Sequence, residues 1–311
     1  MNFSNLNFDF MRWRKPAAVL SILFMLLAVV SLAVRSLNFG LEFTGGTLVE
    51  VSYPAAVELE PVRQLLDHSG YAGARVQHFG SVTEMLVRIP PQDQLKNEDK
   101  NHLGQRVLAQ LQSISAEPIT LKRVEFVGPQ VGAELKEQSS AAVLLALLCM
   151  FVFVSFRFKL KFAMGTLIAL LHDTLVVVGI FSVLKIPFDL NVLAAVLAVI
   201  GYSLNDTIVV ADRIRENFRL MPNQTPIAVI NASLNQTLSR TIITSFLTLL
   251  SLIAFLVLGG EQLFGMSLAL VIGIVVGTYS SIYVVAAFLI FMKVTREDFL
   301  ELPKEALDDR P

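Results

Sequence analysis

The chain has 311 residues, of which 54% are hydrophobic and only 16% are charged, and its formal net charge is −1. Soluble domains carry about 25% charged residues, so we expect much of the surface to face lipid rather than water. The near-neutral charge does not predict a nucleic-acid partner. The single cysteine, Cys149, cannot form an internal disulfide. The sequence also shows no cluster of cysteine and histidine residues at the spacing of a metal site.

Six stretches are apolar and long enough, or nearly so, to cross a hydrocarbon core of about 30 Å as helices. They are Ala17–Val34, Ser139–Phe156, Phe162–Leu184, Leu190–Ala211, Thr241–Gly260 and Gly265–Met292. Arg12, Arg14 and Lys15 precede the first stretch, as basic residues also do in a signal peptide. Because this stretch is 18 residues long and no small-residue cleavage pattern follows it, we predict an uncleaved membrane anchor over residues 17–35.

Basic residues in the short loops predict the orientation of the chain. They precede the first stretch, separate the second from the third, and follow the fourth and the sixth: Arg12, Arg14, Lys15, Arg157, Lys159, Lys161, Arg213, Arg215, Arg219, Lys293 and Arg296. The opposite short loops hold only Lys185. We therefore predict that residues 1–16 and 297–311 are cytoplasmic, and that residues 139–296 contain the other five spans.

Residues 36–138, between the first two spans, are then expected outside the cytoplasm, in the periplasm. Their apolar pattern predicts strands over Leu48–Tyr53, Arg75–Phe79, Met85–Ile89 and Ile119–Val127, and helices over Glu60–Ser69 and Asn97–Leu111. The order β-α-β-β-α-β is that of a ferredoxin-like domain. The predicted fold class is an α-helical integral membrane protein with six transmembrane helices and an inserted α+β ferredoxin-like periplasmic domain.

Polar and ionisable residues inside three of the predicted spans are the candidates for function. A charge near the centre of a transmembrane helix costs roughly 2.5–3.5 kcal/mol on insertion scales and usually faces the interior of the bundle. The candidates are His172 and Asp173 in the third span, Asn205 and Asp206 in the fourth, and Arg240 and Thr244 at the start of the fifth. Neighbouring positions do not share one face of a helix, so one of His172 and Asp173 is expected to be structural.

Helix geometry predicts that Asp206 and Arg240 lie at similar depth. Asp206 is 16 residues from Leu190, or roughly 24 Å, and Arg240 is 19 residues from Gly259, or roughly 28 Å. A polar stripe runs along the same span as Arg240, formed by Thr237, Thr241, Thr244, Thr248 and Ser251. Beside Asp206, this stripe predicts the wall of a hydrated pathway. The alternatives are that the hydroxyl groups bond within their own helix or join helices, and that Arg240 is an anchor at the membrane edge.

The last span carries small residues at every fourth position. They are Gly265, Ala269, Gly273, Gly277 and Ser281. Small residues on one face let two helix backbones approach closely, so we predict a packing seam along this helix.

Several segments carry a family likeness. Phe39–Thr47 (FGLEFTGGT) follows the first span, Val127–Leu135 (VGPQVGAEL) leads into the second, and Gly201–Asn217 (GYSLNDTIVVADRIREN), Ser233–Ser245 (SLNQTLSRTIITS) and Gly265–Val284 lie in spans four to six. With the His172-Asp173 pair, these segments resemble SecF proteins of the SecD/SecF family, and the likeness covers about residues 8–296. The segment Gly201–Asn217 is long enough to be specific. Glu42 stands where many members have aspartate.

The resemblance implies a subunit of the resistance–nodulation–division superfamily that pairs with SecD and associates with the SecYEG channel. Such proteins use the proton-motive force to promote the translocation of preproteins across the bacterial inner membrane, without a cofactor. The resemblance also implies that Asp206 is the proton-pathway acid and Arg240 the essential arginine, the same residues that their depth selects. His172, Asp173, Asn205 and Thr244 are candidate accessory residues.

Other functions remain open from the sequence. A half-unit of a small-molecule or lipid exporter would fit the same superfamily, but such exporters usually have twelve spans and a second large periplasmic domain. A purely structural scaffold would not need Asp206 inside the membrane. An enzyme is the least favoured class, because no nucleophile is paired with a base and His68, His78 and His102 are scattered as surface residues would be.

Overall fold

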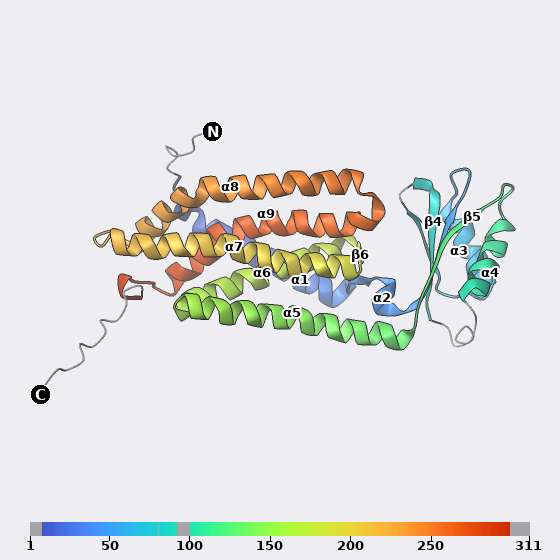
Figure 1. Cartoon of the computed structure of the whole chain (residues 1–311), viewed down its shortest axis with the longest axis horizontal. Helices are drawn as coiled ribbons and strands as arrows, with labels where there is room; N and C mark the ends of the chain where they lie inside the picture. Colours follow the sequence, from blue (N-terminus) through green and yellow to red (C-terminus); the bar gives the residue numbers. More distant parts are fainter. Residues whose placement is uncertain (1–7, 80, 92–99, 299–311) are drawn as a thin grey trace, which may run out of the picture.

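The protein is elongated, with a bundle of long helices at one end and a small α/β domain at the other (Figure 1). The computed structural model describes residues 8–79, 81–91 and 100–298. The predicted helix start at Asn97, residues 1–7 of the predicted cytoplasmic N-terminal segment and most of the predicted tail 297–311 lie outside the described residues.

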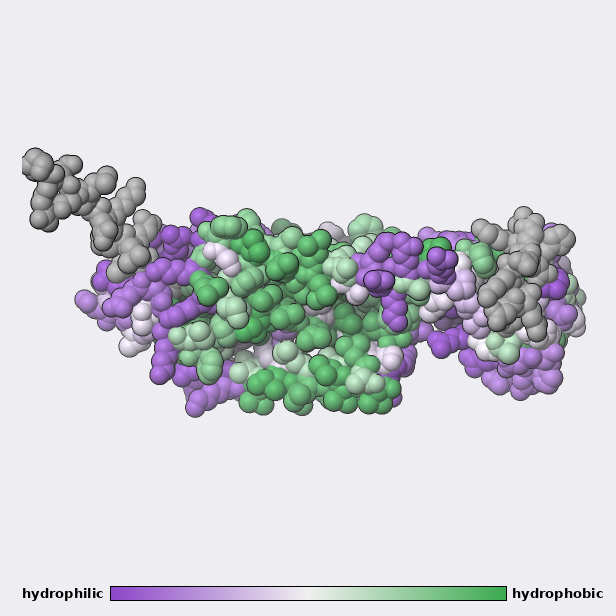
Figure 2. Space-filling view, turned by 90° about the horizontal axis from the view of Figure 1, so that it is seen from below, coloured by the Kyte–Doolittle hydropathy of each residue, from purple (hydrophilic) through white to green (hydrophobic). Residues whose placement is uncertain are grey.

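Six helices are long and apolar enough to cross a membrane, judged by length and composition. They are α1 (Arg14–Arg35), α5 (Pro129–Arg157), α6 (Leu160–Leu184), α7 (Leu190–Leu220), α8 (Pro226–Leu258) and α9 (Gly260–Phe291), flanked by the short 3-10 helices η1 (Phe10–Trp13) and η3 (Arg296–Asp298). Figure 2 shows a broad hydrophobic surface over the bundle, bounded by hydrophilic surface toward both ends. Each predicted span therefore corresponds to one helix, and the chain is a multi-pass membrane protein.

Three of these helices run well beyond the stretches that hydropathy marks. Helix α8 begins at Pro226 rather than Thr241, because Thr225 caps it: its hydroxyl oxygen accepts a hydrogen bond from the backbone N–H of Ala228 at 3.3 Å. Helix α5 likewise begins at Pro129, and α7 continues past its predicted end. Hydropathy detects only the part of a helix that suits lipid, whereas caps and polar packing decide where the helix begins and ends.

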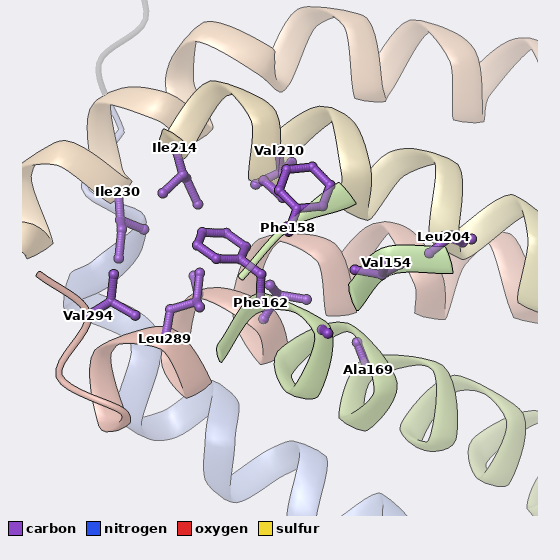
Figure 3. Packing of buried hydrophobic residues seen from close by; sticks show 14 of the residues in the cluster. Val154, Phe158, Phe162, Ala169, Leu204, Val210, Ile214, Ile230, Leu289 and Val294 are labelled. Atoms are coloured by element: carbon purple, nitrogen blue, oxygen red, sulfur yellow. The ribbon is translucent and has the colours of Figure 1, made fainter. Parts of the chain in front are cut away.

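The bundle has a continuous apolar core at the end remote from the α/β domain (Figure 3). Phe158 and Phe162 stack there with ring centroids 5.8 Å apart. Around them lie side chains from α5 to α9 and the segment that follows α9, including Val154, Ala169, Leu204, Val210, Ile214, Ile230, Leu289 and Val294. Helix α6 is buried over much of its circumference, because it packs against α1, α5, α7 and α9.

The α/β domain lies between α1 and α5 in the chain. Its elements are β2 (Gly46–Ser52), α3 (Leu59–His68), β3 (Arg75–Phe79), β4 (Ser81–Ile89), α4 (Lys100–Gln112) and β5 (Thr120–Val127), in the predicted order of strands and helices. The sheet is antiparallel in the order β3-β4-β2-β5. Val49, Val51 and Val87 on the sheet and Leu66 and Val107 on α3 and α4 are fully buried together. The two helices therefore cover one face of the sheet.

A short connector joins this domain to the bundle. Strand β1 (Asn38–Phe39) pairs in parallel with β6 (Pro187–Phe188), which lies between α6 and α7. The one-turn helix α2 (Leu41–Thr44) follows, and Phe43 joins a cluster of aromatic rings with Phe39, Phe181 and Phe188. The sequence did not predict this two-stranded sheet. Its strands are too short to carry a periodic pattern, and they lie far apart in the chain.

Candidate functional site in the helix bundle

Asp206 is buried between α7 and α8. The residue is only 5% exposed, and its Oδ1 accepts a hydrogen bond from the hydroxyl of Thr241 at 3.2 Å. Its Oδ2 is also buried but has no hydrogen-bond partner among the described residues. One carboxylate oxygen is thus held in place, and the other is available to take up a proton without breaking an existing hydrogen bond.

Arg240, the predicted partner of Asp206, is exposed on the outside of the bundle. Over the described part of the chain, however, no ion pair within 4.0 Å joins the two side chains, and the residue that contacts Asp206 directly is Thr241. Asn205 and Thr244 are exposed as well. These three exposed polar residues lie on α7 and α8 next to the buried acid.

The predicted stripe along α8 separates into two kinds of hydroxyl. Thr244, Thr248 and Ser251 donate to backbone carbonyl oxygens of their own helix at 2.9–3.3 Å. Thr241 instead bonds to α7 through Asp206, and Ser245, which the stripe did not include, bonds to Thr278 of α9 at 2.8 Å. Most hydroxyl groups of the stripe therefore donate within α8, and the contacts to other helices are made by Thr241, Ser245 and Thr248, which accepts a hydrogen bond from the hydroxyl of Tyr202 of α7 at 3.4 Å.

A second polar cluster lies deeper, between α6, α7 and α9. The side chains of His172 and Asp173 are almost fully buried, and the imidazole Nδ1 lies 2.9 Å from Asp173 Oδ1. Asp173 Oδ2 accepts hydrogen bonds from Ser203 of α7 at 2.5 Å and from Ser280 of α9 at 2.7 Å. The imidazole Nε2 has no partner among the described residues.

The expectation that His172 and Asp173 cannot share one buried face, so that one of them is structural, did not foresee their direct contact. It assumed that α6 has one buried face, but neighbours on several sides enclose the helix at this level. Both side chains are therefore buried, and they contact each other directly.

The seam of small residues on α9 lets this cluster form. A Cβ atom added to Gly273 would lie 2.1 Å from Val199 Cγ2, and one added to Gly277 would lie 3.1 Å from Ser203 Cβ. Gly265 contacts Val192 in the same way. Helix α9 therefore packs closely against α7, as the four-residue spacing predicts.

The connector between bundle and domain holds a further polar group that the sequence analysis did not select. Glu42 of α2 lines a pocket with Arg88 of β4 and Asp189 at the start of α7. Burial raises the pKa of Glu42 above its ordinary value, Asp189 adds to this effect and Arg88 opposes it. Arg88 also donates a hydrogen bond to the carbonyl oxygen of Phe39 at 2.9 Å. A charge on Glu42 therefore interacts with charged groups on β4 and at the start of α7, the two elements that meet α2 at the junction.

Two glycines, Gly45 and Gly46, turn the chain from α2 into β2. Their φ angles of +68° and +117° are positive, which favours residues without a Cβ. A Cβ on Gly45 would lie 2.9 Å from the Cα of Pro129, and one on Gly46 would lie 2.3 Å from the carbonyl oxygen of Ile89. Both positions thus favour glycine for two reasons: their φ angles are positive, and α5 and β4 leave no room for a Cβ atom.

No group of three or more histidine, cysteine, aspartate or glutamate side chains among the described residues could hold a metal ion. The candidate site consists of two buried acids in the interior of a six-helix membrane bundle, Asp206 and Asp173, each of which accepts hydrogen bonds from hydroxyl groups. This arrangement is typical of membrane proteins that move protons or ions.

Comparison with known proteins gives the family. The family model described as "Protein export membrane protein SecD/SecF, C-terminal" matches residues 107–295, and the "SecD/SecF GG Motif" model matches residues 30–53, which include Gly45 and Gly46. The chain is 46% identical to a protein translocase subunit SecF of Pseudomonas aeruginosa, over the whole of both chains. It is 45% identical to a SecF of Vibrio alginolyticus, covering 94% of this chain and 91% of that one. The chain belongs to the SecF family of protein translocase subunits.

Solved structures agree with this assignment. The crystal structure of SecDF from Thermus thermophilus, described as a translocon-associated membrane protein, matches with a TM-score of 0.84 and 36% identity. The match covers 94% of this chain but only 40% of that one. A structure of SecDF in a super-membrane-facing form matches with a TM-score of 0.69 and 37% identity. The chain thus spans less than half the length of the SecDF chains that it resembles.

Proposed function

We propose that this protein works with a SecD subunit to promote the translocation of preproteins through SecYEG, using the proton-motive force. The observation that carries the proposal is Asp206: it is buried in a membrane helix, and one of its oxygens has no partner among the described residues. Burial in general disfavours the charged form of a carboxyl and a nearby cation favours it, and Arg240 lies next to Thr241, the residue that contacts Asp206. A carboxyl balanced in this way can load and release a proton as its surroundings change.

The energy is adequate for mechanical work. One charge that crosses a potential of 100 mV yields about 2.3 kcal/mol, so several protons per cycle suffice to move a domain. The TM-scores of the two SecDF structures differ although their identities to this chain are nearly equal. This difference supports a fold that adopts more than one arrangement.

A partner in the membrane explains the exposed polar residues next to Asp206. Asn205, Arg240 and Thr244 lie on the surface of two membrane helices, where contact with lipid would be costly. A SecD subunit against α7 and α8 would cover them and enclose the proton pathway. The match to less than half of each SecDF chain supports a protein that functions with such a second half.

The orientation and the domain assignment belong to the same proposal. We infer that the α/β domain is ferredoxin-like, because its antiparallel strand order β3-β4-β2-β5 is that of a split β-α-β unit with a central strand inserted. The basic loops support a periplasmic position for this domain and cytoplasmic termini, and the relatedness to protein translocase subunits of bacteria supports a place in the inner membrane.

The experiment measures preprotein translocation into inner-membrane vesicles with and without a proton gradient, at matched amounts of assembled subunit. Asp206→Asn keeps the shape and the Thr241 hydrogen bond but cannot titrate, so the gradient-dependent part of translocation should be lost. Asp212→Asn is the matched control on the same helix, because Asp212 is half-exposed and pairs with Arg157 at 3.6 Å. Arg240→Lys keeps the charge and should impair the response less than Arg240→Met. A full response to the gradient in Asp206→Asn would contradict the proposal.

A further inference from the structure

The junction between the bundle and the α/β domain contains another pocket, separate from the one that Glu42 lines. It has a volume of about 230 Å³ and lies between the segment that follows α1 and strands β3 and β4. Of the described residues that line it, two are basic, Arg75 and Arg88, and none is acidic. We propose that this pocket binds the phosphate group of an anionic phospholipid through both arginines.

Arg75 and Arg88 stand directly opposite each other on two antiparallel strands. Their Cα atoms are partners in the register of β3 and β4, so their side chains leave the same face of the sheet with Cβ atoms about 5 Å apart. Like charges in this arrangement destabilise a sheet. Among the described residues, no acidic side chain forms an ion pair within 4.0 Å with either arginine. An anion bound between them would remove the repulsion.

Each of the two guanidinium groups makes one contact within the protein. Arg75 Nη1 donates to Asn38 Oδ1 at 3.1 Å, and Arg88 Nη1 donates to the carbonyl oxygen of Phe39 at 2.9 Å. Both contacts are made to β1, so they hold the arginines against the connector. An arginine side chain has five N–H donors, and its planar fork matches the oxygens of a phosphate group. The remaining donors therefore suit a phosphate group between the two side chains.

Positive charge is concentrated around this pocket. Burial lowers the pKa of Arg88, the acids of the neighbouring pocket oppose this effect, and Arg75 adds to it. Lys136 of α5 contributes a third cation, because its Nζ lies 4.5 Å from the centroid of the Phe39 ring, which lines the pocket. A bound anion would therefore be stabilised by several positive charges, whereas a headgroup with an ammonium of its own would be repelled.

The position of the pocket favours a lipid over a soluble anion. Helix α1 ends at Arg35, and Leu37, which lines the pocket, lies two residues further along, or at most about 7 Å. The headgroup layer on each side of the hydrocarbon core is about 5–8 Å thick, so the pocket lies at the level of lipid phosphates. Leu37, Phe39, Pro90 and Pro91 supply apolar walls for the glycerol and the first carbons of the acyl chains.

The test measures lipid binding to the full chain in detergent by native mass spectrometry, with phosphatidylglycerol as the probe. We expect one tightly bound molecule, and Arg75→Gln should weaken its binding about tenfold, because a charge-assisted hydrogen bond is lost. Arg35→Gln is the control: Arg35 is exposed at the same edge of the membrane but does not line the pocket, so the affinity should stay that of the wild type. Equal losses in both variants would show a general attraction to surface charge and overturn the proposal.

A further variant tests the repulsion between the two arginines. Arg75→Glu places opposite charges at this cross-strand pair, which stabilises a sheet. In lipid-free detergent, β3 and β4 should therefore exchange their amide hydrogens more slowly in Arg75→Glu than in the wild type, although the variant should no longer bind phosphatidylglycerol. Faster exchange in these strands, or lipid binding that persists, would refute the site.

Two additional measurements identify the source of the phosphate group. Phosphatidylglycerol should slow exchange in β3 and β4 of the delipidated chain, and inorganic phosphate should not, because it gains nothing from the apolar walls. Equal protection by inorganic phosphate would make the ligand a soluble anion. The complex purified from membranes should retain the lipid that depends on Arg75, and its absence there would assign the pocket to an acidic group of a partner protein. Either result would overturn the lipid assignment.

Discussion

The glycine pair at the start of the α/β domain allows a quantitative prediction. Gly46 has φ +117°, and a Cβ atom there would lie 2.3 Å from the carbonyl oxygen of Ile89, closer than real Cβ contacts. Gly70, which follows α3, also has a positive φ of +89°, but no heavy atom lies within 4 Å of its added Cβ. Both Gly46→Ala and Gly70→Ala therefore lower the stability through an unfavourable backbone conformation, and Gly46→Ala alone adds a steric collision.

The two costs can be estimated from the structure. A non-glycine residue in such a conformation costs about 1–3 kcal/mol, and this applies to both variants. Gly46→Ala must also separate β2 from β4 at the pair Thr47–Ile89, which loses one or two hydrogen bonds of about 0.5–1.5 kcal/mol each. Gly46→Ala should thus be worse than Gly70→Ala by about 0.5–3 kcal/mol, or roughly 2- to 150-fold in an opening equilibrium, since 1.4 kcal/mol is about tenfold.

Hydrogen–deuterium exchange of the full chain in nanodiscs measures this difference locally. Peptides from β2 and β4 should exchange faster in Gly46→Ala than in Gly70→Ala, while peptides from α6 and α9 should be unchanged and serve as the internal reference. Equal protection of β2 in the two variants would show that the close approach to Ile89 does not constrain the junction.

Two further predictions concern the junction and the bundle. Burial raises the pKa of Glu42, so its contribution to stability is present below its ordinary value of 4.5 and is lost as the pH rises through the raised value. Glu42→Gln should therefore stabilise the junction at pH 7, by less than about 1 kcal/mol because water screens a half-buried group. Thermal unfolding measures this gain, which should vanish at pH 4. A gain that grows toward pH 4 would show that the pKa of Glu42 is lowered instead of raised. In the bundle, Gly273→Ala should lower stability by about 1–3 kcal/mol through its collision with the stiff side chain of Val199. Gly201→Ala, also helical but with open space around its Cβ, should be neutral or stabilising in the same unfolding assay.

The sequence by itself determined the six spans and the order of elements in the α/β domain. Both follow from local pattern: about 20 apolar residues must be helical in lipid, because every backbone group has to be satisfied within the segment. The seam on α9 was predictable for the same reason, since residues four apart lie on one face of a helix. Asp206 could be selected because a charge in an apolar stretch is visible without knowing its neighbours.

What only the tertiary structure decided is which polar groups meet. The sequence paired Asp206 with Arg240, but the side chain that contacts it is Thr241, because the direction in which a side chain points depends on how α7 and α8 are rotated against each other. His172 and Asp173 were not expected to share one face, but both are buried and in contact with each other because α6 is enclosed on several sides. Ser203 and Ser280 come from helices far apart in the chain, and a single serine in a membrane helix carries no signal of its own. Hydrogen bonds between helices depend on rotation and depth to within a few ångströms, and hydrophobic periodicity does not specify either to that accuracy.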